Sequence, residues 1–190
     1  VKSTGVACAS RVEMYFMASR LPSASPVPDV PPVTSSPVRV MLITNPYATS
    51  TTEEGREALT TALTQRYDAE AVPTTHRGHA AELGARAAEE GFDAVVIHGG
   101  DGSVNETVNG LLGAPDRTDR PAAADLPAIG VVPGGNANVF ARALGVDRRS
   151  DRAVDQLFTG LDRGSRRTVG LGHALNRWFL FNAGMGMDAI

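Results

Sequence analysis

The sequence predicts an α/β protein with an open, mostly parallel sheet that carries helices on both faces. Short apolar runs alternate with amphipathic helical runs from Val38 onward. Three of the apolar runs end in turns rich in glycine or asparagine, which is typical of strand ends that meet a ligand in such folds. With 190 residues, 42% of them hydrophobic, the chain has the length of one domain, or of one domain and part of another.

Residues 1–37 are predicted to be a disordered leader. Six prolines lie among Ser, Val and Thr in residues 21–37. Proline fixes φ and removes a backbone donor, so this run suits neither a helix nor an inner strand. A secretory signal is the competing interpretation, but the apolar patch at 14–18 is short and follows Glu13.

The predicted nucleotide-binding α/β domain covers residues 38–163. Its expected strands are apolar runs, of which the second is weakened by Pro73; they lie at 38–44, 69–75, 93–100 and 127–133. The first helix is expected to begin at Thr51 or Thr52, and the second to end at Gly91. Ser103 and Glu106 match a capping box, which predicts a third helix beginning at Ser103. Further helices are expected at 138–146 and 150–161.

The alternation of strand and helix patterns stops in residues 164–190. These residues are predicted to begin a second, β-rich domain that is incomplete in this chain. Two strand-like runs flank a turn at 174–176 with no helix between them. Antiparallel pairing is therefore expected.

Composition excludes several classes of function. The formal net charge of -3 does not suit a nucleic-acid-binding protein. Lys2 is the sole lysine, which excludes the phosphate loop of P-loop nucleotidases and the strand lysine of protein kinases. A single cysteine, Cys8, excludes an intramolecular disulfide and fits the cytosol. No apolar stretch approaches the ~20 residues of a membrane-spanning helix.

The glycine loop at 99–103 predicts a phosphate site. Gly99, Gly100 and Gly102 would let backbone amides approach an anion at the start of a helix. Asp101 would repel a bare phosphate, but Mg²⁺ bridges carboxylates to phosphates. The loop therefore indicates a nucleotide polyphosphate with its metal, bound for phosphoryl transfer.

Structural interpretations compete with these. Ser103 and Glu106 could serve only as a helix cap, and Asn45 and Asn138 only as turn formers. Other pairs and clusters favour structural roles. His76 and His79 are expected to be a surface pair rather than a metal site. Trp178 and Phe179 are expected to lie in the core. The arginines and aspartates of 147–167 are expected to form a solvated face rather than a patch that binds lipid.

Four motifs in order resemble the bacterial diacylglycerol kinase-like lipid kinases, which share a catalytic domain with sphingosine kinases. The matching segments are "NPYAT", "TTHRGHA", "GGDGSVNETVNGLL" and "VVPGGNANVFARALG", followed by "FNAGMGMDA". The resemblance implies an ATP site lined by Asn45, Thr74, Gly100, Asp101, Gly102, Ser103, Asn105, Glu106, Gly135, Asn136 and Asn138, with Mg²⁺ held through phosphate at Asp101.

The resemblance also implies a β-sandwich domain, with the general base beyond Ile190. Three residues depart from the family pattern: Ser103 and Asn136 replace threonines, and Val139 replaces an acid. The leading hypothesis is a cytoplasmic lipid kinase that phosphorylates diacylglycerol or a related lipid at the membrane surface. A degenerate nucleotide-binding module and an NAD kinase are the alternatives, and homodimerisation is left open.

Overall fold

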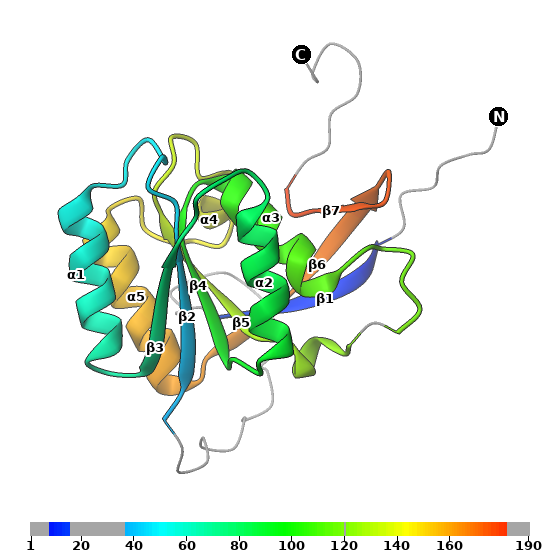
Figure 1. Cartoon of the computed structure of the whole chain (residues 1–190), viewed down its shortest axis with the longest axis horizontal. Coiled ribbons are helices and arrows are strands. Elements are labelled where there is room, and N and C mark those ends of the chain that lie inside the picture. Colours follow the sequence, from blue (N-terminus) through cyan, green and yellow to red (C-terminus); the bar gives the residue numbers. More distant parts are fainter. Residues whose placement is uncertain (1–7, 16–36, 120, 182–190) are drawn as a thin grey trace.

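The fold is one twisted sheet with helices packed on both faces. The computed structural model describes residues 8–15, 37–119 and 121–181 (Figure 1). Its seven strands lie in the order β3-β2-β4-β5-β1-β6-β7. Their bounds are β1 Cys8–Tyr15, β2 Arg39–Thr44, β3 Asp68–Pro73, β4 Ala94–Gly99, β5 Ala128–Pro133, β6 Arg166–Ala174 and β7 Arg177–Phe179. Strands β3, β2, β4 and β5 are parallel, so the predicted fold class is confirmed.

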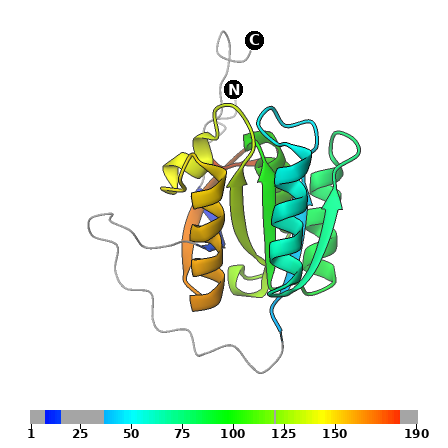
Figure 2. The same ribbon diagram turned by 90° about the vertical axis from the view of Figure 1, so that its left-hand side faces the viewer.

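Helices cover the two faces of the parallel strands. Figure 2 shows α1 and α5 side by side on one face, and Figure 1 shows α2 and α3 on the other. The helices are α1 Glu53–Thr64, α2 His79–Glu89, α3 Asp101–Leu112, the 3-10 turn η1 Ala123–Asp125, α4 Val139–Ala143 and α5 Ser150–Arg163. No helix in the described part of the chain combines the length and apolar character needed to cross a membrane.

Alternate residues of the inner strands supply two separate cores. Met41 and Ile43 pack with α2 and α3, whereas Val40 and Leu42 pack with α1 and α5. Successive side chains of a strand point to opposite faces, so a strand that is apolar at every position must be covered on both. The continuous apolar runs of the sequence therefore fix β2, β4 and β5 as interior strands.

Two predicted helix ends agree with the structure. Thr52 is the N-cap of α1, and its side chain accepts a hydrogen bond from the Gly55 amide at 3.1 Å. Gly91 follows α2 with a φ of 69°, the left-handed conformation that ends helices at glycine.

The predicted disordered leader is wrong for Cys8–Tyr15, which form strand β1. This strand lies between β5 and β6, parallel to the first and antiparallel to the second. The prolines that disfavour regular structure lie within residues 21–37, whereas Cys8–Tyr15 contain none. The remainder of the predicted leader up to residue 36 lies outside the described residues.

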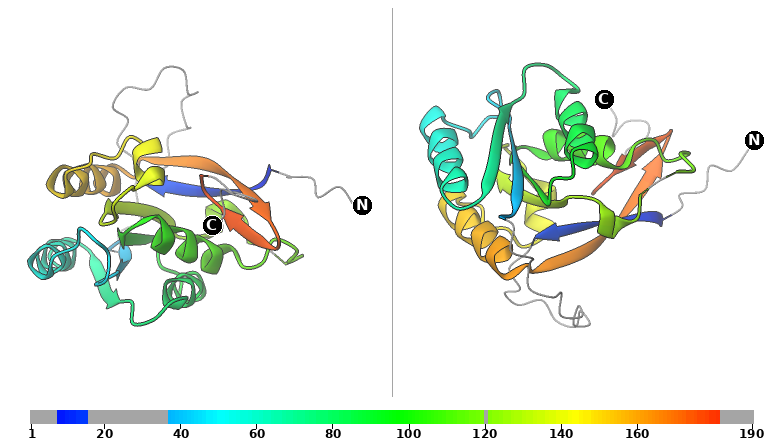
Figure 3. Two further views of the ribbon diagram at one scale, coloured as in Figure 1. Left: turned by 90° about the horizontal axis from the view of Figure 1, so that it is seen from above. Right: turned by 60° about the horizontal axis from the view of Figure 1, so that its bottom comes forward.

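The predicted domain boundary at residue 164 is wrong for the described part of the segment. β6 and β7 are antiparallel, as expected, but β6 pairs with β1 and so extends the first sheet (Figure 3). Trp178 on β7 is buried in the same core as α2 and α3. The missing helix between the two runs signals a change to antiparallel pairing within the sheet. Residues 182–190 lie outside the described residues.

Helices α2 and α3 cross at two glycines. A Cβ on Gly110 would collide with the carbonyl oxygen of Ala81, and one on Gly84 would collide with the carbonyl oxygen of Thr107. Only glycine permits backbones to approach this closely. The crossing therefore fixes how the two helix N-termini sit relative to each other.

Replacing Gly110 with alanine should lower the free energy of unfolding by roughly 1–3 kcal/mol, because the added methyl forces the helices apart. Urea denaturation measures the change. Gly102→Ala in the same helix is the matched control, since a Cβ there meets no atom within 4 Å. The control should be neutral or stabilising, because alanine is the better helix former. Equal destabilisation by both changes would contradict the close crossing.

Candidate functional site

The loops after β2, β4 and β5 leave the sheet at one edge. Thr44 pairs with His98, and Gly99 pairs with Pro133, so the carboxyl ends of the three strands are aligned. The ladder continues past the strands, since the Asn45 amide donates to the His98 carbonyl at 3.0 Å. This edge is where ligands of open α/β sheets bind.

Glycines allow the second and third loops to touch. A Cβ on Gly135 would lie 2.6 Å from the Gly100 Cα, and one on Gly134 would lie 3.2 Å from the Gly99 Cα. The Gly134 amide donates to the Gly99 carbonyl at 2.9 Å. Gly99, Gly100 and Gly135 thus serve the contact between loops. Gly102, in the same glycine loop as Gly99 and Gly100, instead faces open space.

The predicted capping box is wrong, because α3 begins two residues before Ser103. Gly100 is its N-cap and Asp101 its first residue. The Ser103 hydroxyl instead accepts a hydrogen bond from the Asn45 side-chain amide at 3.0 Å. Glu106 accepts one from the Gly78 amide at 3.0 Å. Both side chains therefore connect α3 to neighbouring loops rather than close its own first turn.

Asp101 joins the glycine loop to α4. Its two carboxylate oxygens accept hydrogen bonds from the backbone amides of Val139 at 2.9 Å and Phe140 at 3.0 Å. Asn138 precedes these residues with a φ of 45°, and its side chain accepts from the Gly135 amide at 2.9 Å. The carboxylate predicted to face phosphate and metal thus caps a second helix. Asn138 and Asn45 both shape turns, as the structural interpretation expects.

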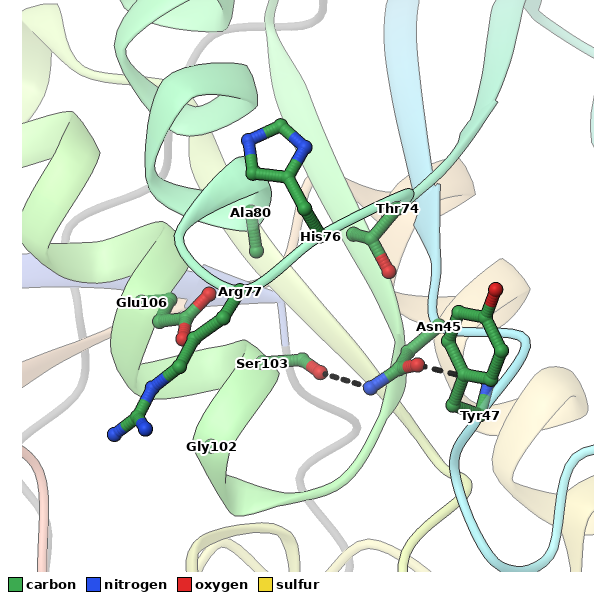
Figure 4. A pocket seen from close by; sticks show the side chains of 9 residues that line it. All are labelled: Asn45, Tyr47, Thr74, His76, Arg77, Ala80, Gly102, Ser103 and Glu106. Carbon is green, nitrogen blue, oxygen red and sulfur yellow. Dashed lines mark hydrogen bonds between the residues drawn. The ribbon is translucent and has the colours of Figure 1, made fainter.

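A groove of about 430 Å³ opens between α2, α3 and the loop after β2 (Figure 4). Its nine lining residues are Asn45, Tyr47, Thr74, His76, Arg77, Ala80, Gly102, Ser103 and Glu106. Five of them are predicted site residues: Asn45, Thr74, Gly102, Ser103 and Glu106. The remaining predicted residues do not line it; they are Gly100, Asp101, Asn105, Gly135, Asn136 and Asn138. The groove therefore joins residues of the first three motifs, and no residue of the fourth motif lines it.

Sequence reasoning missed Tyr47, His76, Arg77 and Ala80 as groove residues. Each lies inside a motif that the sequence singles out, so motif position was the signal that could have found them. His76 and His79 stack with ring centroids 4.8 Å apart. His76 also contacts Glu82 at 3.2 Å. Within the described residues no three His, Cys, Asp or Glu side chains gather as a metal site.

His98 is a buried histidine directly before the glycine loop. Its side chain is 4% exposed, and Nδ1 has no hydrogen-bond partner among the described residues. Burial, and then the positive charge of Arg56, lowers the pKa of His98 below its ordinary value. The folded chain therefore favours the neutral form of this imidazole.

Comparison with known proteins shows the family of this chain. The family model described as "Diacylglycerol kinase catalytic domain" matches residues 39–172. The chain belongs to this family. The match spans the three loops that leave the sheet edge and ends within β6.

Relatives in this diacylglycerol kinase family are longer than this chain. A diacylglycerol kinase of Bacillus subtilis is 35% identical over 121 residues, which cover 63% of this chain and 36% of the relative. One of Staphylococcus aureus is 33% identical over 146 residues, or 75% of this chain and 42% of the relative. A solved diacylglycerol kinase structure from Bacillus anthracis has a TM-score of 0.61 at 25% identity, covering 77% of this chain and 50% of that one.

Removing the Asp101 carboxylate should release the start of α4. We expect Asp101→Ala to speed amide hydrogen exchange at Val139 and Phe140 and to lower the unfolding free energy by roughly 1–3 kcal/mol, because two amides at the start of α4 lose a charged acceptor. NMR-detected exchange measures the first effect. Asp116→Ala, which removes an exposed carboxylate, should leave both amides unchanged. Unaltered exchange in Asp101→Ala would show that the carboxylate does not cap α4.

The lowered pKa of His98 predicts a pH-dependent stability. The unfolded chain takes up a proton near pH 6.5, whereas the folded chain does so only at lower pH. The stability that the folded chain gains from a neutral His98 is fully present above pH 6.5. It is lost as the pH falls from 6.5 toward the pKa of His98 in the folded chain. Urea unfolding between pH 7.5 and 5.5 should show a steeper decline for the wild type than for His98→Gln, by up to about 1.4 kcal/mol per pH unit. Parallel declines would contradict a neutral buried His98.

Proposed function

We propose that this chain forms the nucleotide-binding part of a lipid kinase that transfers the γ-phosphoryl group of ATP to a hydroxyl of diacylglycerol or a related lipid. The observation that carries the proposal is the groove itself. It lies at the carboxyl edge of the parallel strands, and residues from three of the family-like motifs line it. The family match and the names of the relatives support the choice of acceptor.

The first turn of α3 supplies the anion-binding end of the groove. The first amides of a helix have no carbonyl partner within it, and the helix dipole favours negative charge there. Gly102 leaves this turn uncovered, while Ser103 and Asn45 form one wall through their hydrogen bond. In this proposal the phosphates of ATP lie along the turn, and Thr74 and Glu106 line the adjoining part of the groove.

The described residues fit a magnesium ion that arrives with the nucleotide better than a resident one. Mg²⁺ keeps several waters and binds one or two carboxylates together with substrate phosphates. Asp101 and Glu106 each accept backbone amides, yet each carboxylate retains lone pairs for such a contact. A bound Mg²⁺ would neutralise charge that develops on the phosphates. In this proposal, Asp101 and Glu106 hold in place the loops that face the Mg²⁺ ion.

The choice of a lipid hydroxyl as the phosphoryl acceptor rests on the names of the relatives. This chain spans only 36–42% of the lengths of the two curated relatives described above. A lipid hydroxyl and its base are therefore proposed for the natural protein as a whole. The cytoplasmic face of a membrane is the proposed place where the enzyme meets its lipid.

The decisive assay supplies γ-labelled ATP, Mg²⁺ and mixed micelles to the natural protein that contains these residues. Diacylglycerol, ceramide and sphingosine are tested in separate micelles, with NAD as a soluble acceptor. Label in a lipid product supports the proposal and identifies the acceptor. Transfer to NAD alone, or to no acceptor, would reject it.

Filling the space beside Gly102 should block the nucleotide without harming the fold. We expect Gly102→Leu to weaken MgATP binding by about tenfold or more, because the side chain would occupy the anion end of the groove. Isothermal titration calorimetry measures the affinity, and urea denaturation checks the fold. Ala58→Leu adds a similar side chain to an exposed position of α1 and should change neither quantity. Unchanged MgATP affinity in Gly102→Leu would place the nucleotide elsewhere.

A nucleotide-binding module without catalysis is the second candidate. It is favoured by Asp101, whose two oxygens are already engaged by α4, and by Val139, which stands where the resemblance implies an acid. Thermal-shift measurements separate the two functions when they are combined with the labelled-ATP assay. Stabilisation by MgATP without any transfer by the natural protein would favour the module.

A further inference from the structure

Arg77 is the arginine that the groove presents to a ligand. It lies in the loop between β3 and α2, and it is the one lining residue that carries a permanent positive charge. Figure 4 shows its side chain running past Glu106, with the guanidinium on the side of Gly102. The His76 ring points away from Gly102 in the same view and contacts Glu82 instead.

The guanidinium of Arg77 has no partner within the described residues. Neither a hydrogen bond nor an ion pair to that part of the chain engages it, although Glu106 lines the same groove. Glu106 is held by the Gly78 amide at 3.0 Å. By contrast, Arg86 and Arg149 each bind a carboxylate at 2.6–2.7 Å. The side chain of Arg77 is therefore available to an anion.

The backbone around Arg77 is nevertheless fixed. Thr74 donates its amide to the Thr44 carbonyl at 2.8 Å, which ties the loop to β2. The Thr75 amide donates to His79 Nδ1 at 3.1 Å, and the Gly78 amide donates to Glu106. Gly78 itself has a φ of 91° and turns the chain directly into α2. A short loop held on both sides of residue 77 fixes the point from which the Arg77 side chain extends.

The negative charge of the proposed ligand favours such a group. Lys2, the only lysine in the chain, lies outside the described residues, so among those residues arginine supplies the permanently charged cations. A guanidinium offers a planar set of donors that binds two phosphate oxygens at once. Gly102 and Ser103, in the first turn of α3, line the same groove.

We propose that Arg77 binds the phosphate chain of the nucleotide and sets the preference of the groove for nucleoside polyphosphates over nucleosides. This assignment rests on the proposed function. It gives the segment "THRGHA" a direct contact with ligand, whereas the side chains of Thr75 and His79 serve the loop.

Calorimetric titration with MgATP and with adenosine tests the assignment on the 190-residue chain. Arg77→Gln should weaken MgATP binding by about tenfold or more, because a charge-assisted pair is lost, and should leave the adenosine titration unchanged. Arg77→Lys should recover part of the MgATP affinity. Arg163→Gln removes an exposed arginine from the last turn of α5, at the opposite edge of the sheet, and should leave MgATP binding unchanged.

The outcomes distinguish this inference from the proposed function. Wild-type binding of MgATP that persists unchanged in Arg77→Gln overturns the role of Arg77 and leaves the nucleotide site standing. Absence of MgATP binding by the wild type overturns both. A parallel titration with phosphatidic acid micelles separates the source of the phosphate: loss of micelle binding in Arg77→Gln without loss of MgATP binding would also overturn the assignment. Urea denaturation of each variant confirms that the exposed changes leave the fold intact.

Discussion

The close crossing of α2 and α3 is the constraint on which the site depends. Gly84 and Gly110 let the two backbones approach to a separation that no side chain permits. The N-terminal ends of the two helices both line the groove, so their separation affects its shape. Interiors pack densely and transmit such shifts, hence a methyl added far from the ligand would change the walls of the site. The hydrogen bond from Gly78 to Glu106 repeats the same connection at the groove itself.

The parallel part of the fold could be predicted because its information is local. Continuous apolar runs fix β2, β4 and β5, and Thr52 and Gly91 mark helix ends by their own chemistry. Strand β1 could not be predicted in the same way, because its partners β5 and β6 are more than 100 residues distant in sequence. A strand inserted from the N-terminus is decided by pairing rather than by propensity. The pairing of β6 with β1 likewise explains why residue 164 is not a boundary.

The site was predicted as a set of loops, and the loops do meet. What the sequence could not show is which atoms of each residue are already engaged. Ser103 and Glu106 match a capping box by spacing, but α3 begins earlier and the two side chains reach neighbouring segments. Asp101 has the right chemistry for a metal, yet its oxygens accept the amides that start α4. Spacing reports which residues share a helix face, whereas partners far along the chain decide their roles.

The segment "GGDGSVNETVNGLL" therefore serves mainly to connect α3 to the neighbouring elements. Gly100 allows the turn at Gly135 to approach closely, and Gly110 does the same for α2. Asp101 accepts a hydrogen bond from the first residue of α4. Asn109 binds both the amide and the carbonyl of Trp178 and so attaches β7 to the same helix. One helix thus carries the proposed phosphate end of the groove and anchors the strand that leads toward the C-terminus. Because most of the motif serves these contacts, a match to it indicates the shape of the site more directly than its chemistry. In the proposed function, the chemistry depends on groups that these contacts leave free, namely the open turn at Gly102 and the guanidinium of Arg77.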